Sequence, residues 1–387
     1  MPSVNISLLS LSTNVTDNES QQDPVINTTM FGLLYWVLGL TVLEALLCFG
    51  VIFASFLLIR YCLETVRIDN LSKRAVFITG CDTGFGRGLA LKCLEHGMPV
   101  FAGCLTQQGI ESLSAEARKS IGNGRSLDAF LMDVTSDESV EKAAKRLEEK
   151  CEKFGGLHAV VNNAGITGKH IADDFLDMRE YMKVAEINLW GPVRTTMAVK
   201  KLLKKSRGRV VQVASICARV GLPGLGPYTV SKYGISAYCD VIRQELRAFG
   251  ISVHILEPGF FDTPLINRQK IDAEISEAWE QAPSDVKAEY GEKFFNDGKD
   301  SVIISKTILA STARQSTQMF LNSIASSQIS LVVDAYFHAI TAKYPRSRYQ
   351  IGWDSILLFI PFSYLPTGLQ DYIFAAAGLF LPKPACH

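Results

Sequence analysis

The chain has 387 residues, in which 39 Lys and Arg balance 39 Asp and Glu, so the formal net charge at pH 7 is zero. No run of like charge stands out, which argues against a nucleic-acid-binding surface. Nine cysteines are scattered without Cys-x-x-Cys pairs, a pattern that predicts neither a disulfide framework nor a metal site.

An apolar segment near the N-terminus predicts a membrane anchor. Residues 31–59 are predominantly apolar, with Glu44 as their one charged residue, and they exceed the roughly 20 residues needed to span a bilayer. The segment lacks a basic stretch before it and a cleavage site after it, which favours an uncleaved anchor over a signal peptide.

The flanks of this segment predict its orientation. Residues 1–30 contain no Lys or Arg, whereas Arg60 and Arg67 follow the segment, so the positive-inside rule places the tail 1–30 in a lumen and the rest of the chain in the cytosol. We therefore expect a single-pass protein of the endoplasmic reticulum membrane, with a mitochondrial membrane as the alternative. The tail also carries four N-glycosylation sequons, at Asn5, Asn14, Asn18 and Asn27.

The remainder of the chain alternates short apolar runs with helical stretches. The runs read as β-strands at about 75–80, 99–103, 127–133, 158–162, 209–214 and 251–256. This alternation predicts an α/β fold, a Rossmann-like doubly wound parallel sheet over residues 74–350, joined to the N-terminal transmembrane helix.

The first strand runs into a Gly-rich turn and then a helix. Glycines let a dinucleotide pyrophosphate approach the backbone, and the free N–H groups of the helix N-terminus receive its negative charge. A tight turn without a ligand is the alternative. The candidate cofactor-binding residues of this turn are Thr79, Gly80, Asp82, Gly84, Phe85 and Gly86.

Small and polar residues also follow later strands, and one amide lies in an apolar helical stretch. Each of them alone would be ordinary turn chemistry or a polar helix residue. Their succession in one chain favours a ligand site at the strand ends. They are Asp133 and Val134, the group Asn163, Ala164 and Gly165, the helical Asn188, and Pro258, Gly259 and Thr263.

Tyr228 and Lys232 are four positions apart, which places them on one face of a helix. A protonated Lys beside a phenol favours phenolate and is expected to lower the pKa of Tyr228 towards neutrality. A hydroxyl with such a pKa can exchange a proton with a substrate oxygen. Ser215 precedes this pair in a Val-Ala-Ser stretch at the end of a predicted strand.

Together these motifs resemble the short-chain dehydrogenase/reductase superfamily over roughly residues 74–350. The resemblance implies that Tyr228 is the general acid/base and that Lys232 binds the cofactor ribose and lowers the tyrosine pKa. It implies that Ser215 binds and orients the substrate oxygen, and that Asn188 holds a water that relays protons from Lys232. Members of this family commonly form homodimers, so the resemblance also implies a homodimer.

Within the superfamily the chain resembles the branch of retinol, 17β-hydroxysteroid and 3-hydroxybutyrate dehydrogenases. Val184–Gly191 is most similar to the hydroxybutyrate members, whereas Tyr364–Tyr372 and the anchor are more similar to 17β-hydroxysteroid members. The leading prediction is a lipophilic alcohol or ketone drawn from a membrane. A small hydroxy acid, with Lys169 and His170 as cations for its carboxylate, is the alternative, and an inactive anchored scaffold is a third reading.

The turn after the second strand bears on the cofactor. Gly103–Thr106 contains neither an acidic residue for a ribose 2′-hydroxyl nor a basic one for a 2′-phosphate. Asp82 would repel an added phosphate, and Arg87 lies inside the helix. We expect NAD as cofactor, with NADP possible.

Two stretches in the C-terminal third of the chain lie beyond the predicted cofactor site. The charged, helical residues 263–326 are expected to cover the substrate as a lid. Residues 351–387 are apolar but interrupted by Pro361 and Pro366, so they are too short to span. They are expected to lie on the membrane or line the substrate entry, or else to pack on the domain as a helix pair.

Overall fold

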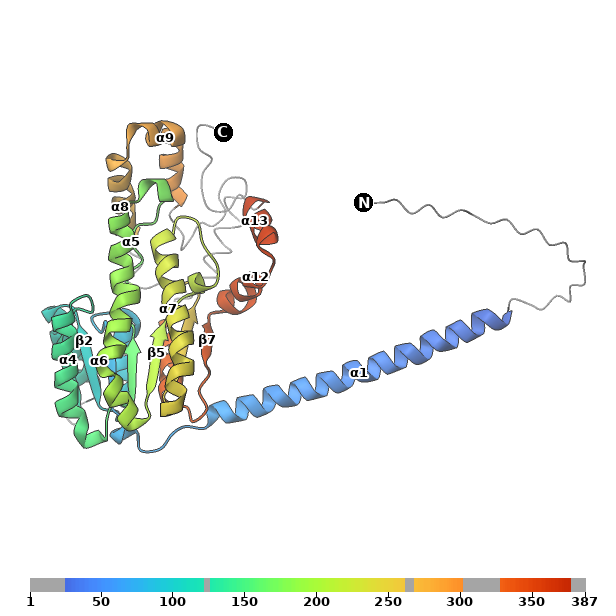
Figure 1. The fold of residues 1–387 in the computed structure, drawn as a ribbon, viewed down its shortest axis with the longest axis horizontal. Helices are drawn as coiled ribbons and strands as arrows, with labels where there is room; N and C mark the ends of the chain where they lie inside the picture. The colour runs from blue at the N-terminus through green and yellow to red at the C-terminus, as the bar shows by residue number, and fades with distance from the viewer. Residues whose placement is uncertain (1–24, 122–125, 262–267, 302–327, 377–387) are drawn as a thin grey trace, which may run out of the picture. The chain divides into compact units, whose positions relative to one another are not determined.

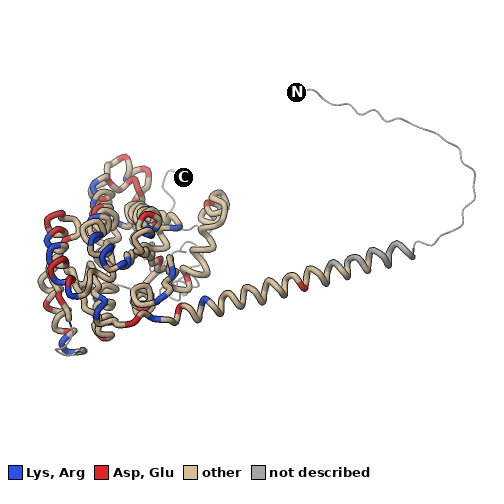
Figure 2. The backbone as a smooth tube through the Cα atoms, turned by 60° about the horizontal axis from the view of Figure 1, so that its bottom comes forward, with Lys and Arg blue, Asp and Glu red and all other residues tan. Residues whose placement is uncertain are grey.

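The computed structural model describes residues 25–121, 126–261, 268–301 and 328–376. The chain divides into two compact units, Met1–Leu63 and Glu64–His387. Helix α1 (Val25–Thr65) accounts for the described part of the first unit. Its portion Thr41–Thr65 is long and apolar enough to cross a membrane and is not buried by the protein. Charged residues are rare along α1 and spread over the second unit (Figure 2).

The second unit contains a seven-stranded, fully parallel sheet in the order β3-β2-β1-β4-β5-β6-β7 (Figure 1). All six predicted strands are confirmed. The seventh strand, β7, was not predicted. It is an edge strand of four residues that pairs with β6, and its mixed polarity gives no apolar run in the sequence. The strands are β1 (Val76–Thr79), β2 (Val100–Cys104), β3 (Leu127–Leu131), β4 (Ala159–Asn162), β5 (Arg209–Val213), β6 (Ser252–Pro258) and β7 (Arg348–Ile351).

Helices cover both faces of the sheet, which confirms the doubly wound prediction. One buried cluster joins the sheet to α2 (Gly84–Glu95), α3 (Gln107–Ile121) and α11 (Ile329–Thr341). A second cluster, on the opposite face, joins it to α4 (Asp137–Cys151), α6 (Gly191–Ser206) and α7 (Gly226–Glu245) (Figure 1). The central strands β1, β2, β4 and β5 are buried along their whole length, as expected for a parallel sheet.

The strand order reverses between β1 and β4, because the chain fills one half of the sheet through β3 and then the other half. In doubly wound folds the crevice at such a reversal, outside the carboxyl ends of the strands, is where ligands bind. Gly80, Asp133, Asn163, Ser215 and Gly259 follow the carboxyl ends of β1, β3, β4, β5 and β6, so the fold brings these predicted site residues to this one edge.

The predicted lid region, 263–326, is helical where it is described. It forms α8 (Arg268–Gln281) and α9 (Ser284–Ser301), while residues 262–267 and 302–327 lie outside the described residues. Trp279 and its neighbours on α8 pack against Phe175, in the loop between β4 and α5 (Met178–Ala185).

The C-terminal stretch forms a π-helical turn (Ser355–Phe359), α12 (Ile360–Ser363) and α13 (Thr367–Ala376). Phe359 packs into an apolar cluster with Ile216 and Cys217 of the loop after β5, which agrees with the helix pair packed on the domain. Other apolar side chains of the same stretch are exposed, among them Leu357 at 71% and Tyr364 at 78%.

Candidate active site

The Gly-rich turn has the backbone conformation that only glycine adopts without strain. Gly80 and Gly84 have φ angles of 70° and 62°. A side chain on Gly80 would place its Cβ 2.8 Å from the Cα of Ala164, whereas a Cβ on Gly84 would meet no atom within 4 Å. A Cβ on Gly86 would collide with the Asn163 amide. Gly80 and Gly86 therefore permit close packing, and Gly84, which begins α2, leaves the backbone open to a ligand.

Thr79 and Asn163 tie the ends of β1 and β4 together beneath this turn. The Thr79 hydroxyl accepts hydrogen bonds from the N–H groups of Asn163 and Ala164, each at 3.1 Å. The Asn163 side-chain amide donates to the carbonyls of Thr79 and Gly80, each at 3.0 Å, and accepts from the Tyr336 hydroxyl at 3.2 Å. Thr79, only 2% exposed, braces the site rather than lining it.

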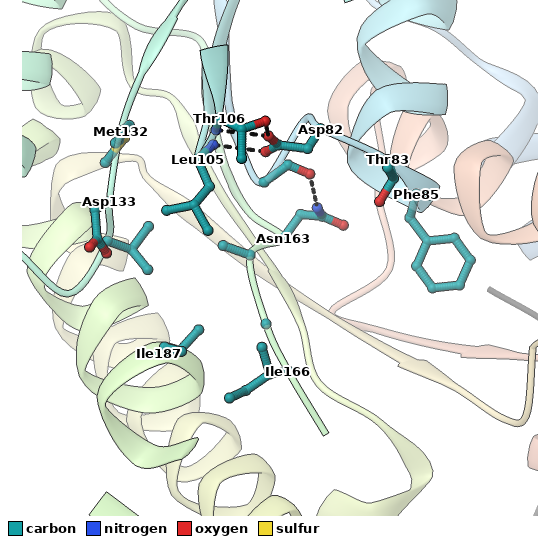
Figure 3. A pocket seen from close by; sticks show the side chains of 15 residues that line it. Asp82, Thr83, Phe85, Leu105, Thr106, Met132, Asp133, Asn163, Ile166 and Ile187 are labelled. Carbon is teal, nitrogen blue, oxygen red and sulfur yellow. Dashed lines mark hydrogen bonds between the residues drawn. The ribbon is translucent and has the colours of Figure 1, made fainter. Parts of the chain in front are cut away.

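A cavity of about 520 Å³ lies between the turn and the ends of β2, β3 and β4 (Figure 3). It brings together most of the predicted cofactor residues, namely Gly80, Asp82, Gly84, Phe85, Asp133, Val134, Asn163, Ala164 and Gly165. It also includes residues that sequence reasoning did not select, namely Thr83, Leu105, Thr106, Met132, Ile166 and Ile187. All but Leu105 and Thr106 are chain neighbours of predicted residues, and adjacency was the signal that could have found them.

Tyr228 and Lys232 lie in the first two turns of α7, as their spacing predicts. The Lys232 ammonium lies 5.3 Å from the centroid of the Tyr228 ring and donates a 3.2 Å hydrogen bond to the Val213 carbonyl. Ser215 lies close enough to Tyr228 to influence the pKa of its phenol. A Cβ on Gly165, which lines the cavity, would lie 3.8 Å from Lys232 Nζ, so Lys232 lies next to the cavity at Gly165. The fold thus assembles the predicted proton-transfer group beside the dinucleotide crevice.

The pKa of Tyr228 shifts in the direction opposite to the one expected. Burial raises the pKa of Tyr228 well above its usual value, the nearby Cys217 thiol raises it further, and the hydrogen bond from Ser215 opposes both. Burial likewise lowers the pKa of Lys232 to about 8, because the charged form loses its water. Desolvation therefore dominates the pKa shifts of both groups, and the tyrosine is a neutral phenol that can donate a proton.

Asn188 lies in a π-helical segment, Glu186–Trp190, between α5 and α6. Its side chain accepts from the Ile166 N–H and donates to the Ile166 carbonyl, both at 2.8 Å. It also donates to the Ser231 hydroxyl at 3.1 Å. Such π-bulges often occur at functional sites. The amide thereby holds the loop after β4 against α7, next to Lys232.

Pro258 ends β6, and the Gly259 N–H bonds to the Ile351 carbonyl at 2.8 Å. The Asp354 carboxylate accepts from the Phe260 N–H at 2.7 Å, and a Cβ on Gly259 would collide with it. Asp354 thus shapes this loop from 95 positions away, and nothing local in the sequence indicated it. Thr263 lies outside the described residues.

These residues fit a nicotinamide dinucleotide. The open backbone at Gly84, beside the N-terminus of α2, suits a pyrophosphate, and Lys232 lies close to Gly165, which lines the same cavity.

Comparison with known proteins gives a consistent result. The short chain dehydrogenase family matches residues 74–274. The 3beta-hydroxysteroid dehydrogenase dhs-16 of Caenorhabditis elegans is 39% identical, over 90% of this chain and 85% of its own. The 17-beta-hydroxysteroid dehydrogenase type 6 of Bos taurus is 36% identical, over 87% and 98%. Human retinol dehydrogenase 16 is 37% identical, over 82% and 93%.

Solved structures share the fold. A short-chain dehydrogenase from Streptomyces avermitilis superposes with a TM-score of 0.54 at 22% identity, covering 78% of this chain and 94% of that one.

The chain belongs to the short-chain dehydrogenase family, in the branch that holds retinol and steroid dehydrogenases. It is an NAD(P)-dependent oxidoreductase that acts on hydroxyl groups.

Proposed function

We propose that this protein is a membrane-anchored oxidoreductase that interconverts a lipophilic alcohol and its ketone or aldehyde, a steroid or a retinoid. The observation that carries the proposal is the grouping of Ser215, Tyr228 and the Lys232 ammonium, with Lys232 next to Gly165 of the dinucleotide cavity. Bound nicotinamide supplies the hydride chemistry, and the protein supplies position and electrostatics.

The roles of the four side chains follow from their chemistry. Tyr228, a neutral phenol, donates its proton to the carbonyl oxygen in reduction and takes it back in oxidation. The Lys232 ammonium stabilises the phenolate that results. Ser215 binds the same substrate oxygen, and Asn188 positions the loop after β4 and a relay water.

The surroundings of the proton-transfer group favour a lipophilic substrate. Tyr228 packs against the apolar cluster of Ile216, Val220, Leu225 and Phe359. The cations needed by a small hydroxy acid are poorly placed. His170 is 4% exposed, and burial lowers its pKa to about 4, so it is neutral at pH 7. Lys169 lines a different cavity, which also contains carboxylates of α5 and α8.

An assay of the full-length protein in membranes tests the substrate class. With NAD, we expect estradiol, a 3β-hydroxysteroid or all-trans-retinol to be oxidised with a kcat/KM at least about 100-fold above that for 3-hydroxybutyrate, since a site built for an apolar group lacks a partner for a carboxylate. The reverse order of kcat/KM would refute the lipophilic assignment and support the hydroxy acid.

We propose that residues 31–59 span the endoplasmic reticulum membrane, with residues 1–30 in the lumen and the 74–350 domain in the cytosol. In this arrangement residues 263–326 form the lid, and residues 351–387 contact the membrane near the substrate entry. The apolar α1 helix and the exposed Leu357 and Tyr364 support this arrangement.

Glycosylation of the sequons in residues 1–30 tests whether this tail lies in the lumen. In mammalian cells we expect endoglycosidase to increase the electrophoretic mobility of the chain, and substitution of Gln at Asn5, Asn14, Asn18 and Asn27 to abolish that shift. In intact microsomes an added protease should digest the catalytic domain. A domain that is protected from the protease, together with an unglycosylated tail, would contradict the proposed orientation.

A further inference from the structure

The Asp82 carboxylate reaches from the Gly-rich turn after β1 to the turn after β2. Its Oδ2 accepts a 2.8 Å hydrogen bond from the Leu105 N–H. Its Oδ1 accepts from the N–H and the hydroxyl of Thr106, at 3.0 and 2.7 Å (Figure 3). A Cβ on Gly109 would collide with this carboxylate, so the glycine at the start of α3 makes the approach possible.

The turn after β2 is the part of a dinucleotide-binding fold that meets the adenosine ribose. An acidic residue about 20 positions after the Gly-rich turn ordinarily accepts the ribose 2′-hydroxyl there. In this chain that position falls on the apolar Leu105, which is 64% exposed. The carboxylate in this place comes instead from Asp82, and both residues line the cavity.

The Asp82 carboxylate accepts three hydrogen bonds and can accept one more. A carboxylate offers about four lone-pair sites, two on each oxygen. Oδ1 uses both of its sites on Thr106, and Oδ2 uses one on Leu105. The remaining site on Oδ2 can accept a hydroxyl, whereas a phosphate, which has no proton to donate at neutral pH, would meet a like charge.

The donors and cations that a 2′-phosphate needs are already engaged. Asp82 occupies the N–H groups of Leu105 and Thr106. Arg87, the nearest cation in the sequence, donates to Glu116 at 2.7 Å and to Ser112 at 2.8 Å. Among the described residues that line the cavity there is no Lys or Arg.

We propose that Asp82 is the residue that selects NAD over NADP. It accepts the ribose 2′-hydroxyl in place of the missing acidic residue after β2, and it holds the backbone donors that would otherwise bind a 2′-phosphate. This rests on the proposed function only in that the chain binds a nicotinamide dinucleotide; it does not depend on which alcohol is oxidised.

Equilibrium binding of NADH and NADPH to the detergent-solubilised full chain, followed by nicotinamide fluorescence, tests the proposal. The wild type is expected to bind NADH more tightly than NADPH. Asp82→Ala, which frees both N–H groups and removes the charge, is expected to shift the ratio of the two dissociation constants towards NADPH by about tenfold or more, the scale of one charge-assisted hydrogen bond. Asp82→Asn, which keeps the volume, should shift the ratio in the same direction.

Glu111→Gln is the matched control, since it removes one exposed carboxylate from α3, the helix that follows the turn after β2, without contacting Leu105 or Thr106. Its ratio should stay within about twofold of wild type, the scale of an exposed charge. A wild type that prefers NADPH, or Asp82 variants that bind NADH with an unchanged ratio, would overturn the proposal. Wild-type protein that binds NADH selectively but oxidises no steroid or retinol would refute the substrate assignment alone.

Discussion

Replacement of Tyr228 by Phe is expected to lower kcat by about 10³-fold, the middle of the range for removal of a general acid/base. The phenyl ring retains the packing of Tyr228 against its apolar cluster, so the fold and the dissociation constant for NADH should change little. The measurement is steady-state turnover of the best alcohol substrate, together with NADH binding on the same preparation.

Tyr233→Phe is the control for this variant. Tyr233 lies on the same helix, α7, but it is 44% exposed and outside the Ser215–Tyr228–Lys232 group. Its loss should leave kcat within about twofold of wild type, as for a surface substitution. If Tyr228→Phe keeps more than a tenth of wild-type turnover, Tyr228 is not the proton donor.

The second large effect is expected at Glu257, a fully buried carboxylate at the end of β6. It accepts a 2.7 Å bond from Arg219, of the loop after Ser215, and it pairs with Arg348 of β7. Gln350 donates to its other oxygen at 3.2 Å. Glu257, on β6, thus connects the loop after β5, through Arg219, with the edge strand β7, through Arg348.

Glu257→Gln keeps the volume but leaves the two guanidinium groups without this counter-charge. Loss of one partner from a buried pair typically costs about 3 kcal/mol or more. We expect the apparent thermal midpoint to fall by about 5 °C or more at a fixed heating rate, because a kilocalorie shifts a domain of this size by a few degrees.

The exposed pair Lys201–Glu148, at 3.0 Å with side chains 88% and 54% exposed, provides the control. Glu148→Gln should shift the midpoint by only about 1 °C, since exposed pairs contribute little. Equal small shifts in both variants would show that the Glu257 network does not stabilise the fold.

Local pattern predicted a large part of this molecule. The central strands β1, β2, β4 and β5 are buried and mainly apolar, and burial on both faces of a parallel sheet favours that composition. Tyr228 and Lys232 face the same way because a helix places residues four apart on one face. The edge strand β7 escaped prediction because it has only four residues, and Arg348 and Gln350 leave it without an apolar run.

The pKa of Tyr228 illustrates what local pattern could not predict. From the sequence, a neighbouring ammonium should lower it, and in the structure burial raises it and brings the pKa of Lys232 down to about 8. Burial depends on segments far away in the chain, such as the C-terminal Phe359 that packs on the loop after β5.

The sequence by itself determined the doubly wound sheet, the Gly-rich turn at Gly80–Gly86 and the spacing of Tyr228 and Lys232, because strand burial, glycine conformation and helical period act over a few residues. Only the tertiary structure decided that Asp82 bonds to the turn after β2, that Asp354 shapes the loop at Gly259 and that Glu257 lies between two arginines. Each of these contacts joins side chains from separate elements, and the packing of the sheet and helices brings them within hydrogen-bonding distance.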